Sequence, residues 1–278
     1  MDALTYIDGE WLEGNPPLLG ARTHATWLSS IVFDGARAFE GVAPDLDLHC
    51  ERVVRSALAF GLKPTMTAEG IFELAWEGIR KFPDNAELYI RPMFWAEQGW
   101  VDPDPDSTRF AMVVYDSPLP APTGLAVCLS SRRRPAPDMA PTDAKASCLY
   151  PNASRALREA TEKGFDNAVV RDPLSNVAEL ATANLFIAKN GIVHTPVPNG
   201  TFLNGVTRQR VISLLREADI DVRERTVAVP DLEAADEMFA TGNHGKVQPI
   251  TRYEDRDMQA GPMYKRAREL YWAYAHKK

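Results

Sequence analysis

The sequence predicts an α+β protein with mixed sheets. Strand-like alternation and helical spacing of apolar residues both occur in each half of the chain. Turn residues separate many neighbouring strands, which favours hairpin pairing. With 278 residues the chain is long enough for two domains or one large one. Hydrophobic residues make up 45% and charged residues 25%, as in ordinary globular proteins.

Charge and cysteine usage narrow the function classes. The net charge is −7 and the one basic block is Arg132–Arg134, which argues against a nucleic-acid partner. No apolar run approaches ~20 residues, and the first residues lack the features of a signal peptide. Cys50, Cys128 and Cys148 are widely spaced and unlike a metal-binding pattern. We therefore expect a cytoplasmic protein without a metal site or membrane span.

The first half of the chain is expected to form a small domain of residues 1–117. Its expected elements are a hairpin at Thr5–Leu12, a helix end or turn leading into a strand at Ile31–Phe39, helices at about Leu48–Leu62 and Thr67–Lys81, and strands at Glu87–Trp95 and Arg109–Tyr115. On the first helix we expect one apolar stripe, Val54, Ala57, Leu58 and Leu62, opposite His49, Arg52 and Ser56.

A proline-rich linker is expected at residues 118–124, because the segment 117–124 holds three prolines in eight residues. Residues 125–278 would form the larger domain. Its expected elements are strands at Leu125–Ser131, Asn167–Arg171, Val177–Ala188 and Ile192–Thr195, a strand entering Thr241, and helices at Asn152–Lys163, Thr207–Ala218, Asp231–Asp236 and Pro262–His276.

Lys145 is the strongest candidate for a catalytic residue. It stands in a small, mildly apolar stretch, 141–152, that contains no other lysine. A lysine with little water around it loses stability in its charged form, so it can attack a carbonyl and form a Schiff base. Taken alone, Lys145 is more readily explained as a solvated surface charge.

Other residues could complete a site for pyridoxal phosphate. Gly205 precedes an expected helix, where backbone amides and the helix dipole favour a phosphate, and Thr207 could cap that helix. The loop Thr241–Gly245 could form a second anion-binding turn, and Arg52 could add a fixed charge. An ordinary helix cap, a surface turn and a solvated arginine remain the alternatives.

Two further side chains suit the ring of that cofactor. Glu179 lies in an apolar strand, where a carboxylate is costly unless a cation such as a protonated pyridine nitrogen meets it. Tyr150 could reach the ring hydroxyl. Tyr89 and Arg91 point to the same side of a strand and could receive a substrate carboxylate, unless they form a polar outer face.

These motifs, found in this order, resemble the class IV, fold-type IV aminotransferases, and most closely the branched-chain amino acid aminotransferases. The similar segments are Val32–Phe39, Tyr89–Pro92, Ala144-Lys145 with Tyr150, Glu179 with Asn184–Phe186, and Leu203–Arg208. The resemblance covers nearly the whole chain. It implies a small α/β domain, a larger mixed-sheet, barrel-like domain, a homodimer, and an active site at the domain and dimer interface.

The resemblance also implies residue roles. Lys145 would form the Schiff base and carry the proton, Glu179 would hold the pyridine nitrogen and Tyr150 the ring oxygen. The remaining cofactor-binding positions would be Arg52, Asn184, Leu203, Gly205, Val206, Thr207, Thr241, Gly242 and Asn243. Substrate would meet Phe33, Tyr89, Arg91 and His244. The implied reaction is transamination between an aliphatic L-amino acid and 2-oxoglutarate.

Three segments depart from the family pattern: the short linker, Glu97–Asp102, and Thr241–Gly245, where Asn243 can still donate to a phosphate but His244 replaces a small residue. These departures leave the substrate open. Aminodeoxychorismate lyase, a D-amino acid or amine transaminase, and a cofactor-binding protein without activity remain alternatives.

Overall fold

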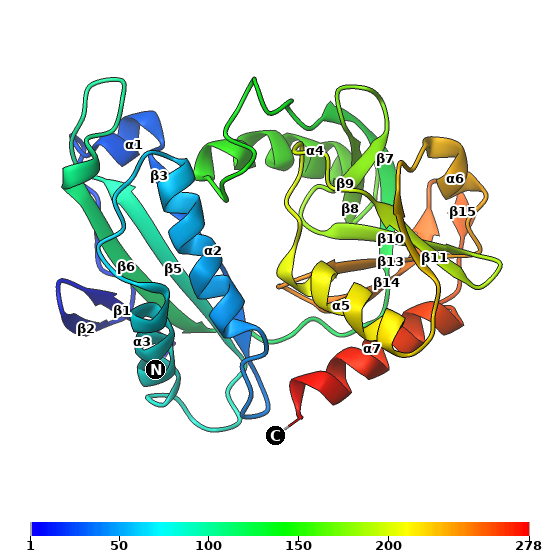
Figure 1. Ribbon diagram of the computed structural model, residues 1–278, viewed down its shortest axis with the longest axis horizontal. Coiled ribbons are helices and arrows are strands. Elements are labelled where there is room, and N and C mark those ends of the chain that lie inside the picture. Colours follow the sequence, from blue (N-terminus) through cyan, green and yellow to red (C-terminus); the bar gives the residue numbers. More distant parts are fainter. Residues whose placement is uncertain (1, 278) are drawn as a thin grey trace. The chain divides into compact units, whose positions relative to one another are not determined.

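The computed structural model describes residues 2–277, which fall into two compact units. The first contains the residues up to Leu119 together with Asp143–Leu149, and the second contains Pro120–Thr142 together with the residues from Tyr150 onward. Figure 1 labels the elements of each unit. The segment around Lys145 therefore belongs to the first unit, although it lies later in the sequence than the expected linker.

The first unit is an antiparallel sheet with its two longer helices on one face (Figure 1). Its strand order is β2-β1-β6-β5-β3, and β4 also pairs with β5. The elements are β1 (Ala3–Ile7), β2 (Glu10–Glu13), α1 (His24–Leu28), β3 (Ile31–Phe33), β4 (Ala36–Ala38), α2 (Leu46–Ala59), α3 (Ala68–Ile79), β5 (Leu88–Ala96), a 3-10 turn at Pro105–Ser107, β6 (Thr108–Asp116) and a 3-10 turn at Ser147–Leu149.

Local sequence explains the boundaries of several elements. Asp8 and Gly9 both adopt positive φ, 53° and 90°, as the tight turn between β1 and β2 requires. Thr67 caps α3, because its hydroxyl accepts a hydrogen bond from the Gly70 amide at 3.1 Å. Residues 31–39 form two short strands, β3 and β4, in place of the helix end or turn expected there.

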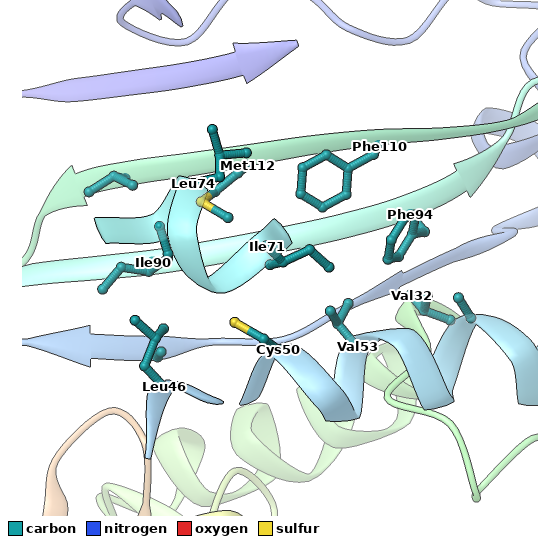
Figure 2. Close-up of a cluster of buried hydrophobic side chains, with 14 of the residues drawn as sticks. Val32, Leu46, Cys50, Val53, Ile71, Leu74, Ile90, Phe94, Phe110 and Met112 are labelled. Atoms are coloured by element: carbon teal, nitrogen blue, oxygen red, sulfur yellow. The ribbon is translucent and has the colours of Figure 1, made fainter. Parts of the chain in front are cut away.

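The core of this unit lies between the sheet and helices α2 and α3 (Figure 2). Helix α2 contributes Leu46, Cys50, Val53 and Ala57 to it. The predicted stripe on this helix is wrong at Leu58, which is 61% exposed. The buried face is rotated because His49 and Ser56 are also buried, where they bond to Asp34 and to the backbone of Lys145.

The second unit is built on a nine-stranded mixed sheet ordered β12-β11-β10-β13-β14-β7-β8-β9, with β15 paired to β14. Its strands are β7 (Leu125–Arg133), β8 (Asn167–Arg171), β9 (Val177–Leu180), β10 (Asn184–Lys189), β11 (Ile192–Pro196), β12 (Val222–Arg225), β13 (Glu237–Gly242), β14 (Lys246–Tyr253) and β15 (Arg256–Asp257). Its helices are α4 (Tyr150–Glu162), α5 (Val206–Glu217), α6 (Val229–Glu233) and α7 (Pro262–Ala275). The predicted α+β class is confirmed.

One expected strand of this unit is wrong in a way that matters for the site. The segment 177–188 is not continuous: β9 ends at Leu180, and the Leu180 amide bonds to the Ala183 carbonyl across a tight turn. Strand β9 then pairs with β8, whereas β10 pairs with β11 and β13. The break brings Glu179 and Asn184 together from two different strands.

Two features are absent from residues 2–277. No helix there has the length and apolar character needed to cross a membrane. No group of at least three histidine, cysteine or acidic side chains in the same range could hold a metal ion.

Candidate active site

In the second unit, the predicted acid Glu179 is held by two neighbouring side chains. Glu179 is 8% exposed. The amide nitrogen of Asn184 donates to its Oε2 at 3.3 Å, and Arg134 Nε lies 3.4 Å from its Oε1. The guanidinium of Arg134 is thus a cation already present in the fold, a partner that the sequence did not reveal. It favours the negative charge of the carboxylate, which suits an acceptor for a protonated ring nitrogen.

Asn184 also binds the turn that precedes α5. Its Nδ2 donates to the Leu203 carbonyl at 2.9 Å, and its Oδ1 accepts from the Gly205 amide at 3.2 Å. A Cβ on Gly205 would lie 2.2 Å from Asn184 Oδ1, so a side chain would collide with the amide. Gly205 is therefore required here for close approach, and one carboxamide joins the acid to the start of a helix.

The start of α5 has the properties of an anion site. Gly205 occupies the N-cap position and has no side chain, so no side-chain cap covers the first turn. The amides of Val206 and Thr207 begin the helix, where the helix itself offers no carbonyl to them and where the dipole favours negative charge. The prediction that Thr207 caps this helix is wrong, because Thr207 is a buried residue of the first turn.

The second predicted anion loop lies beside the first. Thr241 on β13 pairs directly with Asn184 on β10, so the two side chains share a face of the sheet. Thr241 Oγ1 and Asn243 Nδ2 are both buried, and neither has a hydrogen-bond partner within residues 2–277. Such groups are normally satisfied in folded proteins, by water or ligand if not by protein. An anion with several acceptor oxygens fits both.

Two of the predicted site residues of this unit, His244 and Tyr150, are exposed. His244 is the exposed central residue of the turn between β13 and β14, and Gly242 precedes that turn. Tyr150 is the first residue of α4 and is 37% exposed.

In the first unit, Lys145 is held by its backbone next to an aromatic ring. Its amide donates to Ser56 Oγ at 3.1 Å, and its carbonyl accepts from the Phe33 amide at 3.1 Å. The half-buried side chain places Nζ 4.7 Å from the centroid of the Phe33 ring. The segment that carries Lys145 therefore acts as an extra edge along β3, where the Val32–Ala146 bridge continues the contact.

Arg52 is fixed by a buried carboxylate. Its Nε lies 2.6 Å from Asp34 Oδ2 and its Nη2 lies 2.8 Å from Asp34 Oδ1, while His49 Nδ1 lies 2.7 Å from the same Oδ1. Burial alone would raise the pKa of Asp34, but Arg52 and His49 outweigh it and hold this pKa well below its ordinary value. Asp34 therefore stays ionised and orients Arg52.

Tyr89 and Arg91 share one face of β5, while Leu88 and Ile90 enter the core on the other, as expected. Tyr89 stacks on Tyr115 of β6 with 5.4 Å between ring centroids, and Arg91 donates to the Tyr115 hydroxyl. The guanidinium of buried Arg37 lies 5.3 Å from the Tyr89 centroid. Two guanidinium groups and two phenols therefore form a cluster suited to carboxylates.

Sequence reasoning missed several members of these groups: Asp34, His49, Arg37, Tyr115 and Arg134. The sequence could have indicated Arg37, because it stands between two alanines in a short apolar segment. A charged residue in such a segment is expected to have a partner when it is buried. Arg134 had no such signal in the sequence, since it reaches Glu179 only through the folded sheet.

Known proteins share this architecture. Residues 31–253 match the family model described as amino-transferase class IV. A probable branched-chain-amino-acid aminotransferase of Rickettsia bellii is 31% identical over 248 residues, which is 88% of this chain and 85% of the relative. The branched-chain-amino-acid aminotransferase of Pseudomonas aeruginosa is 29% identical over 287 residues, covering 98% and 92% of the two chains.

Solved structures agree with these matches. An aminotransferase from Brucella abortus bound to its cofactor PLP has a TM-score of 0.98 and 53% identity, and all of both chains is covered. The branched-chain amino acid aminotransferase of Escherichia coli has a TM-score of 0.91 and 26% identity, with 99% of this chain and 95% of that chain covered.

Proposed function

This chain belongs to the class IV aminotransferases, and from that premise we propose that it transfers the amino group of a branched-chain L-amino acid to 2-oxoglutarate. Class IV aminotransferases use pyridoxal 5′-phosphate. The residues present fit this cofactor. Helix α5 starts without a side-chain cap, and Gly205 before it has no room for a Cβ. The buried donors of Thr241 and Asn243 lack partners within residues 2–277, and Arg134 supports the Glu179 carboxylate. When bound, the cofactor supplies an aldehyde for the amine and a ring that accepts electrons.

The second unit would hold the cofactor. The amides of Val206 and Thr207, together with Thr241 and Asn243, are proposed to donate to the phosphate, as their position at a helix start and their unmet donors suggest. Glu179 is proposed to accept from the ring nitrogen, and Tyr150 to approach the ring oxygen. The bridge from Glu179 through Asn184 to Gly205 is the observation that carries this assignment, because it sets an acid beside an anion cradle.

Lys145 is proposed to bond to the cofactor aldehyde and then to carry a proton. With the donor bound, Nζ would take the proton from the donor α-carbon and hold it for return. The Phe33 ring next to Nζ restricts where the amine can move and keeps that side apolar. Arg52, with Asp34 fixing its direction, is proposed to pair with an anionic group of the cofactor.

Tyr89 and Arg91 are proposed to receive substrate carboxylates, with Phe33 lining the space for the aliphatic side chain. A dicarboxylate acceptor needs a cation for its second carboxylate, and the guanidinium groups of Arg37 and Arg91 lie beside Tyr89. The named relatives support a branched-chain donor. His244 is proposed to limit the size of the donor, since it replaces a small residue of the family motif.

A donor and acceptor screen of the purified protein tests this proposal. We expect glutamate to form from L-leucine and 2-oxoglutarate, with little from D-alanine or an aromatic amine, and none with the Lys145→Ala variant. Preferential use of D-alanine would reject the L-specific assignment. Release of pyruvate from aminodeoxychorismate without an amino acceptor would indicate a lyase. Light scattering tests the proposed homodimer, which requires twice the mass of one chain.

A further inference from the structure

A lysine occupies an unusual place at the end of the second anion loop. Lys246 is the first residue of β14, directly after the turn at residues 243–245, and is 1% exposed. Its backbone is left-handed, with φ +57°, a conformation that favours glycine or asparagine. Lysine is almost never fully buried, and strain in the backbone often marks a functional position. Both the burial of Lys246 and its backbone conformation are therefore unusual for a lysine.

The ammonium group of Lys246 contacts Asn243 within the same turn. Its Nζ lies 2.8 Å from Asn243 Oδ1 and 6.0 Å from the centroid of the Tyr271 ring on α7. An ammonium has three donors and no acceptor, so only the carbonyl side of a carboxamide can face it. Lys246 therefore decides which way the Asn243 amide points, and the NH2 group is turned away from the lysine.

That NH2 group has no acceptor in the part of the chain that the structure describes, although it is buried. Thr241 Oγ1, two residues earlier, is in the same state. A buried donor without a partner is costly, and a phosphate oxygen would satisfy it. Thr241 shares its sheet face with Asn184, which bonds to Gly205 at the start of α5, so the unmet donors and the helix start belong to one region of this unit.

The turn itself has little freedom to reorient. Gln248 Nε2 donates to the Gly245 carbonyl at 3.0 Å and to the Pro120 carbonyl at 3.2 Å. A Cβ on Gly245 would lie 2.7 Å from Gln248 Cγ, so the glycine leaves room for the Gln248 side chain against the turn. These contacts hold the backbone of the turn at Gly245.

We propose that Lys246 is a positioning residue that holds the Asn243 carboxamide with its NH2 group presented to the cofactor phosphate. Lys246 acts through the hydrogen bond to Asn243 and does not itself touch the phosphate. The proposal rests on the phosphate assignment made above.

A matched pair of substitutions tests the hydrogen bond separately from the volume of the side chain. Lys246→Gln keeps an N–H donor, whereas Lys246→Met has a similar length but no donor. The readouts are the Kd for pyridoxal phosphate, from absorbance titration of the apo-protein, and the Kd for inorganic phosphate, from calorimetry. We expect Lys246→Met to raise both Kd values about tenfold and Lys246→Gln to stay within about threefold of the parent.

A double-mutant cycle shows whether Lys246 acts through Asn243. Asn243→Ala should raise the Kd for pyridoxal phosphate about as much as Lys246→Met, and the double variant should be no weaker than either single variant. Independent effects that multiply in the double variant would overturn the proposal. Equal weakening by Lys246→Gln and Lys246→Met would also overturn it, because charge or packing and not donation would then be responsible.

Asn243→Asp covers the case in which Lys246→Met does not fold. The carboxylate keeps an acceptor for Lys246 but has no NH2 group, so we expect an unchanged melting temperature and a Kd about tenfold higher or more. Parent-like affinity of Asn243→Asp would overturn the proposal. If the parent protein itself binds no pyridoxal phosphate, the proposed function fails as well, whereas parent binding that Lys246→Met leaves unchanged defeats this inference alone.

Discussion

The carboxamide of Asn184 links Glu179 to the Gly205 turn, with Nδ2 3.3 Å from Glu179 Oε2 and Oδ1 3.2 Å from the Gly205 amide. A single side chain therefore sets both the direction of the acid and the position of the first residues of α5. A displacement at one end of this bridge is passed to the other. In our assignment these ends correspond to the ring nitrogen and the phosphate of the cofactor.

Asn184→Leu should weaken both ends of the site. Leucine has a similar size but cannot donate to Glu179 and Leu203 or accept from Gly205. Loss of these hydrogen bonds should cost about 1–3 kcal/mol of the free energy of unfolding, and raise the Kd for pyridoxal phosphate about tenfold or more. Urea unfolding and absorbance titration measure the two effects. Asn85→Leu, at an exposed loop position, is the control and should change neither.

Gly205→Ala should produce a milder form of the same defect through collision alone. The φ of Gly205 is −61°, which alanine tolerates, so backbone strain does not contribute. The new Cβ would meet Asn184 Oδ1 and push the amide away from Glu179. We expect the Kd for pyridoxal phosphate to rise about tenfold. Gly20→Ala, where the nearest atom is Thr23 Oγ1 at 3.7 Å, should leave the Kd unchanged; equal affinities of the two variants would disprove the steric argument.

Asp34→Asn should destabilise the first unit, because it removes the carboxylate that faces Arg52 and His49. Breaking one partner of a buried ion pair costs about 3–5 kcal/mol. Asp34→Glu, which keeps the charge, is the matched control and should lose much less. Urea unfolding at pH 7 distinguishes them, and indistinguishable stabilities of the Asn variant and the parent would show that the pair contributes nothing.

The lowered pKa of Asp34 also determines how the stability of the protein should change with pH. The folded pKa of Asp34 lies below its ordinary value of 3.8, so its ionisation stabilises the fold fully above that value. The contribution falls as the pH drops below 3.8 toward the folded pKa. The parent and the Asp34→Asn variant should therefore differ less in their free energy of unfolding at acidic pH than at pH 7. A difference that grew with acidification would have the wrong sign.

Thiol labelling tests the burial pattern without reference to catalysis. Burial, followed by the charges of Asp34, Asp47 and Glu51, raises the pKa of Cys50 to about 12, and burial also raises the pKa of Cys128. Cys148 is exposed. At pH 8 a thiol reagent should label Cys148 in the native protein and all three cysteines after unfolding. Rapid native labelling of Cys50 would contradict the packing of α2.

The sequence was sufficient for most elements because their signals are local. The Asp8-Gly9 turn, the Thr67 cap and the Pro262–Ala275 helix each depend on residues close in the chain. The errors arose where distant segments decide. The polar face of α2 is buried because Asp34 and the Lys145 backbone bond to it, and no helical periodicity contains that information.

The residues of the candidate site were likewise easier to predict than the residues that support them. Lys145, Glu179 and Gly205 could be proposed from the sequence because their motifs occur together in one order, although each taken alone had an ordinary alternative. Arg134 could not, because it meets Glu179 from the end of another strand. Lys246 lies three residues from Asn243, but its full burial, which singles it out, arises only in the folded protein. The break after Leu180 was hidden as well, since both flanking segments are equally apolar.

The central claim is that Lys145 carries the cofactor, and borohydride reduction followed by peptide mass spectrometry tests it most directly. Reduction of the native protein should leave a phosphopyridoxyl group on the Nζ of Lys145, and the Lys145→Ala variant should carry none. A protein that acquires no such group, or acquires it on another lysine such as Lys163 while Lys145 stays unmodified, would contradict the account.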